Sequence, residues 1–279
     1  MKKMTKFEKL GLEKKLLDTL DDAGFTTPFP IQERTIPVLL EGNDVIGQAH
    51  TGTGKTAAYS LPMLQLISSK QGIQGIIMAP TRELALQITS EINRFAKNTG
   101  IRTATIYGGQ GMGIQLDALR KKPEILVATP GRLIDHLKRG TIKLNNVKHA
   151  VLDEADVMLD MGFIPDIERI FKLTPFTRQT LFFSATMAPE IERITNTFLS
   201  APVRVEIARQ ATASESIKQS VVMFNPKRKD RESSEKRQLL RQLIDLEGKN
   251  CTNAIVFCNR KTDVDICSKS LNKYGYQAA

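Results

Sequence analysis

The chain has 279 residues, a formal net charge of +10 and 41% hydrophobic residues. That apolar fraction suffices for a packed core and excludes a disordered tail, and no run approaches the roughly 18 apolar residues of a membrane span. Charged residues Lys6, Glu8 and Lys9 stand where a signal peptide needs an apolar segment, so a cytoplasmic protein is expected. The positive charge is compatible with a polyanionic partner but is weak evidence by itself.

Cysteine and histidine usage predicts neither disulfides nor a metal cage. Cys251, Cys258 and Cys267 all lie near the end of the chain and lack the CxxC spacing of a zinc or redox motif. Reduced thiols in a cytosolic fold are therefore expected. The three histidines are scattered along the chain.

From residue 43 onward, short β-branched runs alternate with longer amphipathic segments such as 83–97. The predicted strands are residues 45–46, 75–78, 104–107, 125–127, 150–152, 180–183 and 203–205. Such alternation predicts an α/β fold, a doubly wound parallel sheet with helices on both faces. Ligands of these sheets bind at the carboxyl ends of the strands, so residues that follow the strands are the candidate site residues.

After a domain at 1–208, the small and polar residues 209–216 predict a linker, and 217–279 begin a second alternation. Its predicted elements are a strand at 221–224, a helix at 235–246, a strand at 254–258 and a helix at 263–274. The charged run 227–232 favours a solvated loop, with an RNA contact as the alternative.

The sequence Ala-His-Thr-Gly-Thr-Gly-Lys-Thr follows the first predicted strand and opens a helix, as a phosphate-binding loop does. Its small residues let backbone N–H groups surround phosphate oxygens, Lys55 supplies a cation, and the Thr56 hydroxyl can bind Mg²⁺. Ala49 replaces the usual first glycine of the motif. The predicted ATP-binding residues of this loop are Ala49, Thr51, Gly52, Thr53, Gly54, Lys55 and Thr56.

Asp153 and Glu154 come directly after the predicted strand 150–152. One carboxylate there can hold Mg²⁺, mostly through water, while its neighbour orients or deprotonates an attacking water. Acids at this point could also simply cap the next helix. The preceding phosphate loop favours the catalytic interpretation, with Lys55, Thr56, Asp153 and Glu154 as catalytic residues, and with Thr56 and Asp153 as the ligands of Mg²⁺.

Asp153-Glu154-Ala155-Asp156 and the phosphate loop resemble the signature of the DEAD-box ATP-dependent RNA helicases, and further motifs follow in family order. The resemblance implies a RecA-like fold, ATP and Mg²⁺ as cofactors, and RNA bound through its backbone. An adenine-recognition segment is implied at 7–32, with Phe7 stacking on the ring, Gln32 pairing with its edge, and Thr27 nearby.

Other segments resemble the family's RNA-gripping loops, whose hydroxyls, amides and arginines meet phosphates without reading bases. The implied RNA-binding residues are Pro80, Thr81, Arg82, Gly108, Gly109, Thr129, Pro130, Gly131 and Arg132. The segment that couples hydrolysis to strand separation is implied at Ser184, Ala185 and Thr186. Residues 256–259 resemble the first RNA motif of a second lobe.

Two departures from the family pattern are visible. His50 stands where many relatives carry glutamine, and the chain stops before the later second-lobe motifs, including the arginines that reach the γ-phosphate. We therefore expect nucleotide binding without efficient hydrolysis, and an incomplete second RecA-like domain at 217–279. A DNA helicase and a non-catalytic RNA clamp remain alternatives. The glycines at 109–113 do not complete a dinucleotide fingerprint, because position 114 is Ile114.

Overall fold

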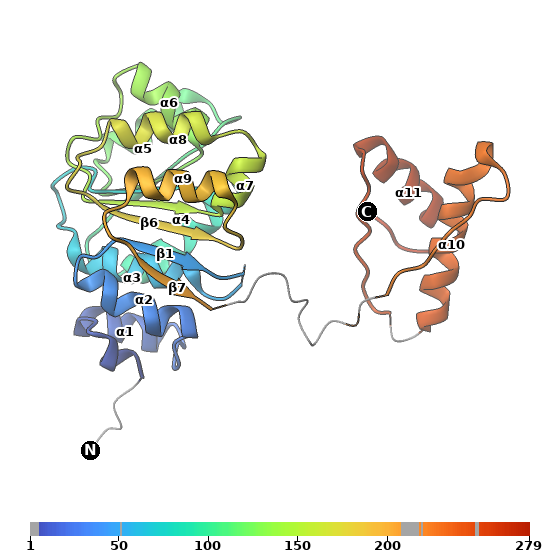
Figure 1. Cartoon of the computed structure of the whole chain (residues 1–279), viewed down its shortest axis with the longest axis horizontal. Helices are drawn as coiled ribbons and strands as arrows, with labels where there is room; N and C mark the ends of the chain where they lie inside the picture. Colours follow the sequence, from blue (N-terminus) through green and yellow to red (C-terminus); the bar gives the residue numbers. More distant parts are fainter. Residues whose placement is uncertain (1–5, 51, 208–217, 219, 249–250) are drawn as a thin grey trace. The chain divides into compact units, whose positions relative to one another are not determined.

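The computed structural model describes residues 6–50, 52–207, 218, 220–248 and 251–279 (Figure 1). The chain divides into two compact units, Met1–Thr212 and Ala213–Ala279. The predicted linker at 209–216 lies outside the described residues. No helix among the described residues is long and apolar enough to cross a membrane.

The first unit is built on a seven-stranded parallel sheet, which confirms the predicted fold class. The strand order is β3-β4-β2-β5-β6-β1-β7. The strands are β1 Val45–Gln48, β2 Gly75–Met78, β3 Thr103–Ile106, β4 Ile125–Ala128, β5 His149–Asp153, β6 Gln179–Ser184 and β7 Val203–Glu206. Each lies within one or two residues of its predicted range, because buried parallel strands are short apolar runs bounded by polar turns.

Helices cover both faces of this sheet (Figure 1). One face carries η1 Lys6–Leu10, α1 Lys14–Asp22, α2 Pro30–Leu40, α3 Lys55–Leu66 and α4 Arg82–Ala96. The other carries α5 Met112–Arg120, α6 Pro130–Lys138, α7 Ala155–Asp160, α8 Ile164–Lys172 and α9 Pro189–Phe198.

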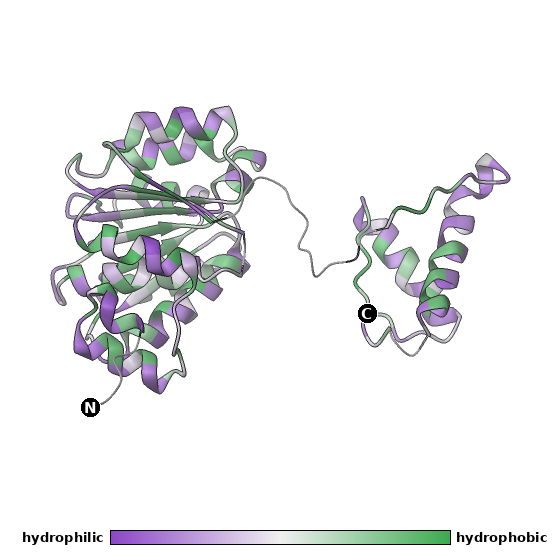
Figure 2. Ribbon diagram, turned by 60° about the horizontal axis from the view of Figure 1, so that its bottom comes forward, coloured by the Kyte–Doolittle hydropathy of each residue, from purple (hydrophilic) through white to green (hydrophobic). Residues whose placement is uncertain are grey.

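Successive residues along a strand contribute their side chains alternately to the two cores. Ile77 and Val151 pack with the first helix layer, whereas Ile76 and Leu152 pack with the second. This follows from the pleat, which points successive side chains to opposite faces of a sheet. Apolar residues therefore line the inner sides of the helices while polar residues face outward (Figure 2).

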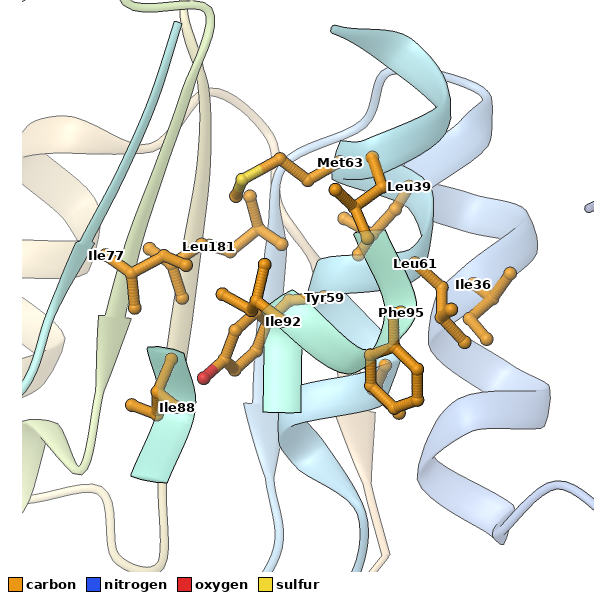
Figure 3. Packing of buried hydrophobic residues seen from close by; sticks show 14 of the residues in the cluster. Ile36, Leu39, Tyr59, Leu61, Met63, Ile77, Ile88, Ile92, Phe95 and Leu181 are labelled. Carbon is orange, nitrogen blue, oxygen red and sulfur yellow. The ribbon is translucent and has the colours of Figure 1, made fainter. Parts of the chain in front are cut away.

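The first core joins α3, the helix that follows the phosphate loop, to the sheet (Figure 3). Tyr59 and Leu61 of α3 pack there with Ile88, Ile92 and other residues of α4. The Tyr59 ring lies 5.3 Å from that of Phe183 on β6, centroid to centroid. The helix that starts at the phosphate loop is therefore anchored in the sheet by its first two turns.

The second unit differs from its prediction. The structure contains η2 Lys229–Arg231 and the helices α10 Glu232–Glu247 and α11 Lys261–Lys273, near the two predicted helices. The strands predicted at 221–224 and 254–258 are wrong, since neither segment is a strand. The predicted loop at 227–232 is only partly correct, because η2 and the start of α10 lie within it.

The physical reason for the missing strands is pairing. A strand exists through backbone hydrogen bonds to a neighbour, and the described residues provide none for these two apolar segments. Their side chains remain open to solvent, with Met223 and Phe257 each 90% exposed. An apolar sequence thus indicates a segment that can become a strand. The strand forms only where a neighbouring strand is available for backbone hydrogen bonds.

Gly47 in the middle of β1 offers a test of how tightly this sheet packs. A Cβ atom at this position would lie 2.5 Å from the Phe183 ring, and overpacking of this kind costs about 1–3 kcal/mol. We expect Gly47→Ala to lower the free energy of unfolding by that amount in urea titrations. Gly113→Ala is the matched control, since a Cβ atom there meets nothing within 4 Å and alanine favours the α5 helix. Equal urea midpoints for Gly47→Ala and the wild type would contradict this packing.

Candidate functional site

The phosphate loop connects β1 to α3 with a backbone that only glycine adopts easily. Gly52 and Gly54 both have a φ of 83°, in the left-handed region where a Cβ atom is strained. The amide of Ala49 donates to the carbonyl of Ser184 at 3.1 Å and ties the loop to the end of β6. The N-terminus of α3 therefore lies at an anchored loop. The first N–H groups and the dipole of the helix favour the binding of an anion there. Thr51 lies outside the described residues.

Lys55 is the first residue of α3 and is buried, with a side chain only 7% exposed. Its Nζ atom lies 3.8 Å from Oδ1 of Asp153, at the end of β5. Nζ has no hydrogen-bond partner in the described part of the chain. A buried ammonium group without hydrogen bonds is costly, so the site is suited to a ligand that brings anionic oxygens.

The Asp153 carboxylate is held through both of its oxygens. Oδ1 accepts a hydrogen bond from the backbone N–H of Glu154, and Oδ2 accepts one from the Tyr59 hydroxyl, each at 3.0 Å. Burial raises the pKa of the Asp153 carboxyl above its usual range, and the Lys55 ammonium opposes this only in part. Glu154 follows in the left-handed region with a φ of 55°, so the turn that places these two carboxylates is strained.

Glu91 on α4 adds a third carboxylate to this cluster. Burial raises the pKa of Glu91, a hydrogen bond with the Thr56 hydroxyl lowers it, and the charge of Asp153 raises it further. Glu91 and Thr56 are therefore neighbours across α3 and α4. No motif in the sequence pointed to Glu91, because its partner is brought close only by helix packing.

The predicted adenine segment is placed against the phosphate loop, but its two main side chains are engaged internally. Gln32 is 1% exposed; its Nε2 donates to the Gly54 carbonyl at 3.0 Å, and its Oε1 accepts from the Phe29 N–H at 2.9 Å. Phe7 is 2% exposed and packs in the first core. Thr27 and Phe29 are exposed. Adenine recognition by Gln32 and Phe7 therefore stays a prediction.

The three predicted RNA loops lie at the carboxyl ends of β2, β3 and β4, which are neighbours in the sheet. Direct contacts join them. Arg82 stacks over the Tyr107 ring at 5.1 Å, next to Gly108 and Gly109. Arg132 donates to the Gln110 carbonyl at 2.9 Å, which links the loop 129–132 to the same turn. Pro80 and Thr81 precede α4, where the Thr81 hydroxyl accepts from the Leu84 N–H.

A buried polar network supports the turn after β3 from below. Gln115 Nε2 donates to the Tyr107 carbonyl at 2.8 Å, and Gln115 Oε1 lies 3.0 Å from Nε2 of His136. Burial lowers the pKa of His136, with the charges of Arg132 and Arg139 acting in the same direction. A neutral His136 donates from Nε2 to Gln115 and completes the network. In the sequence, His136 had been only one of three scattered histidines with no expected role.

Asp156 links the acidic motif to the predicted coupling segment. Its Oδ2 accepts from the backbone N–H of Ala185 at 3.1 Å, and from the N–H and hydroxyl of Thr186 at 2.9 and 3.2 Å. Burial raises the pKa of Asp156, but hydrogen bonds from Thr186 and Ser184 outweigh it and leave the pKa below its usual range. The sequence placed Asp156 in a motif without a role for it, and the structure shows that it holds the turn at 184–186.

Comparison with known proteins agrees with this arrangement. The chain matches the DEAD/DEAH box helicase family over residues 29–194, which is more than half of its length. It belongs to that family.

Relatives of this DEAD-box chain extend the match. The ATP-dependent RNA helicase CshA of Limosilactobacillus reuteri is 47% identical over 98% of this chain and 54% of its own length. The DEAD-box ATP-dependent RNA helicase CshA of Bacillus cereus is 45% identical over 99% of this chain and 51% of its own length. The chain therefore spans about half the length of these curated relatives.

Solved structures show the same fold. The crystal structure of a DEAD box protein from Methanococcus jannaschii has a TM-score of 0.70 and 36% identity, covering 97% of this chain and 70% of that one. A hypothetical ATP-dependent RNA helicase from Sulfolobus tokodaii has a TM-score of 0.66 and 36% identity, covering 70% of this chain and 57% of that one.

In this DEAD-box chain, removal of the Asp156 carboxylate tests whether it stabilises the turn at 184–186. We expect Asp156→Ala to lower the free energy of unfolding by about 1–3 kcal/mol near neutral pH, because the N–H groups of Ala185 and Thr186 lose a charged acceptor. Asp160→Ala, an exposed acid on the same helix, is the matched control.

The pH dependence follows from the lowered pKa of Asp156. Its stabilisation is fully present above the ordinary Asp pKa of about 4 and is lost as the pH falls through the lower folded-state value. The difference in unfolding free energy between wild type and Asp156→Ala should therefore shrink below about pH 4. A difference that stays constant down to pH 2 would show that the charge of Asp156 is not what holds the turn.

Proposed function

We propose that this chain binds ATP with Mg²⁺ and the RNA backbone, and acts in an ATP-dependent RNA helicase that separates short duplexes. The observation that carries the proposal is the buried Lys55 ammonium at the start of α3, which lacks a hydrogen-bond partner among the described residues. Phosphate oxygens would satisfy this cation and the free N–H groups of the helix together. The names of the relatives favour ATP and RNA over other nucleotides and polymers.

The donor set fits a magnesium ion. Mg²⁺ prefers oxygen ligands and commonly uses one or two protein groups, waters and the phosphates of a nucleotide. Thr56 and Asp153 would hold it, Asp153 through water. When bound, the ion neutralises charge on the phosphates. The residues of the chain supply the rest, since Lys55 binds the phosphates and Glu154 orients or deprotonates the attacking water.

The proposed RNA site is sequence-independent. Arg82, Arg132 and the glycines at 108–109 present charge and backbone amides at one edge of the sheet, a set that recognises phosphates and carries no base code. RNA is the partner expected there. Residues Ser184–Thr186, which Asp156 holds, would transmit changes at the phosphate site to this RNA site. Local strand separation would occur as such a site closes and opens. The closed and open states would bind RNA with different affinities, and this difference would drive the change.

Two adjacent substitutions test the assignment of roles. Asp153→Asn should weaken Mg²⁺-dependent ATP binding by about 1.5–3 kcal/mol, because a buried charged ligand is lost, which is roughly a 10- to 150-fold change. Glu154→Gln keeps the size of the side chain and should bind ATP·Mg²⁺ as the wild type does. Calorimetric titration of the 279-residue chain measures both. Equal losses in the two variants would contradict the division of roles.

Nucleotide choice tests the adenine segment. Adenine offers a donor where guanine offers an acceptor, so Gln32 should favour ATP over GTP in competition binding. Gln32→Ala should bring the two affinities close to equality, even if both fall because Gly54 loses its hydrogen bond. Gln87→Ala, at an exposed position on α4, should keep the preference. Equal affinity of the wild type for ATP and GTP would remove Gln32 from the site.

A further inference from the structure

Tyr59 is a buried polar residue that the proposed function leaves without a role. It lies one turn into α3, is 0% exposed, and its ring sits within the apolar core (Figure 3). Only its hydroxyl leaves this apolar environment: it donates to Oδ2 of Asp153 at 3.0 Å, and the Thr56 hydroxyl also hydrogen-bonds to it. A carboxylate can only accept, so the direction of this hydrogen bond is fixed.

This bond completes a clamp on the carboxylate. The Glu154 N–H holds Oδ1 while the Tyr59 hydroxyl holds Oδ2, so the plane of the carboxylate is set by one backbone group and one rigid side chain. The Tyr59 ring cannot follow if the carboxylate moves, because it packs at 5.3 Å against Phe183. Aromatic pairs at this separation attract each other beyond simple burial.

The clamped carboxylate lies beside the Lys55 ammonium without a hydrogen bond to it. Lys55 Nζ stays 3.8 Å from Oδ1, beyond hydrogen-bond distance, and has no other partner in the described residues. Oδ1 of Asp153 therefore keeps a lone pair for a further ligand, and Lys55 Nζ keeps its N–H donors for an anion.

We propose that Tyr59 is a positioning residue for the nucleotide site, which orients the Asp153 carboxylate toward Mg²⁺. The proposal rests on the magnesium role of Asp153 given above. Residues that hydrogen-bond to ligating carboxylates commonly change metal affinity 10- to 100-fold when they are replaced.

Tyr59→Phe removes the hydroxyl and keeps the ring. We expect this variant of the 279-residue chain to bind ATP in the presence of Mg²⁺ about 10- to 100-fold more weakly than the wild type, measured by calorimetry over a series of Mg²⁺ concentrations. Tyr276→Phe is the matched control, because it removes another tyrosine–aspartate hydrogen bond, to Asp245 in the second unit. Its Mg²⁺ dependence should equal that of the wild type.

A double-mutant cycle separates positioning from general stabilisation. If Tyr59 acts through Asp153, Tyr59→Phe combined with Asp153→Asn should bind ATP·Mg²⁺ no more weakly than Asp153→Asn alone. Ile36→Val removes a methylene from the same core on another helix, α2, so it controls for a loss of core packing. Additive losses in the cycle, or an equal loss in Ile36→Val, would overturn the proposal.

The outcomes also distinguish this inference from the function it rests on. Unchanged ATP·Mg²⁺ affinity in Tyr59→Phe, with a clear loss in Asp153→Asn, would overturn the role of Tyr59 and leave the nucleotide site intact. Unchanged affinity in Asp153→Asn would instead contradict the magnesium role of Asp153 itself.

Discussion

The separation of two buried opposite charges, Lys55 and Asp153, is the constraint on which the site depends. Each charge is costly to bury, and each is placed by a different element, Lys55 by the start of α3 and Asp153 by the end of β5. Between β5 and β1 in the sheet lies β6, which ends at Ser184. The site therefore exists only when three strand ends are in register.

Register is secured by the apolar layers on either side of the sheet. Parallel pairing aligns Leu152 with Phe182 and Gly47 with Phe183, and the alternating side chains lock these pairs into opposite cores. A slip of one residue would exchange the two cores and move both charges. The packing of the hydrophobic layers thus also fixes the positions of the polar residues at the carboxyl ends of the strands.

The polar edge is a connected structure. Asp156 joins the acidic motif to the turn at 184–186, Ala49 joins the phosphate loop to the end of β6, and Gln32 joins the adenine segment to Gly54. The predicted RNA loops form a second connected group through Arg82 and Arg132. Backbone groups take part in most of these bonds, so the loops cannot shift independently. A displacement of one loop would therefore be felt by the loops bonded to it.

The sequence by itself determined the parallel α/β fold, the seven strands of the first unit and the strand-end placement of the candidate residues, because these depend on local apolar patterns and turn residues. Partners distant along the chain were decided by tertiary structure: Tyr59 with Asp153, Asp156 with Thr186, and His136 with Gln115. The two strands expected in the second unit failed for the same reason. A local pattern shows what a segment is suited to become, whereas hydrogen bonds and charge pairs need a second group that only folding brings within reach.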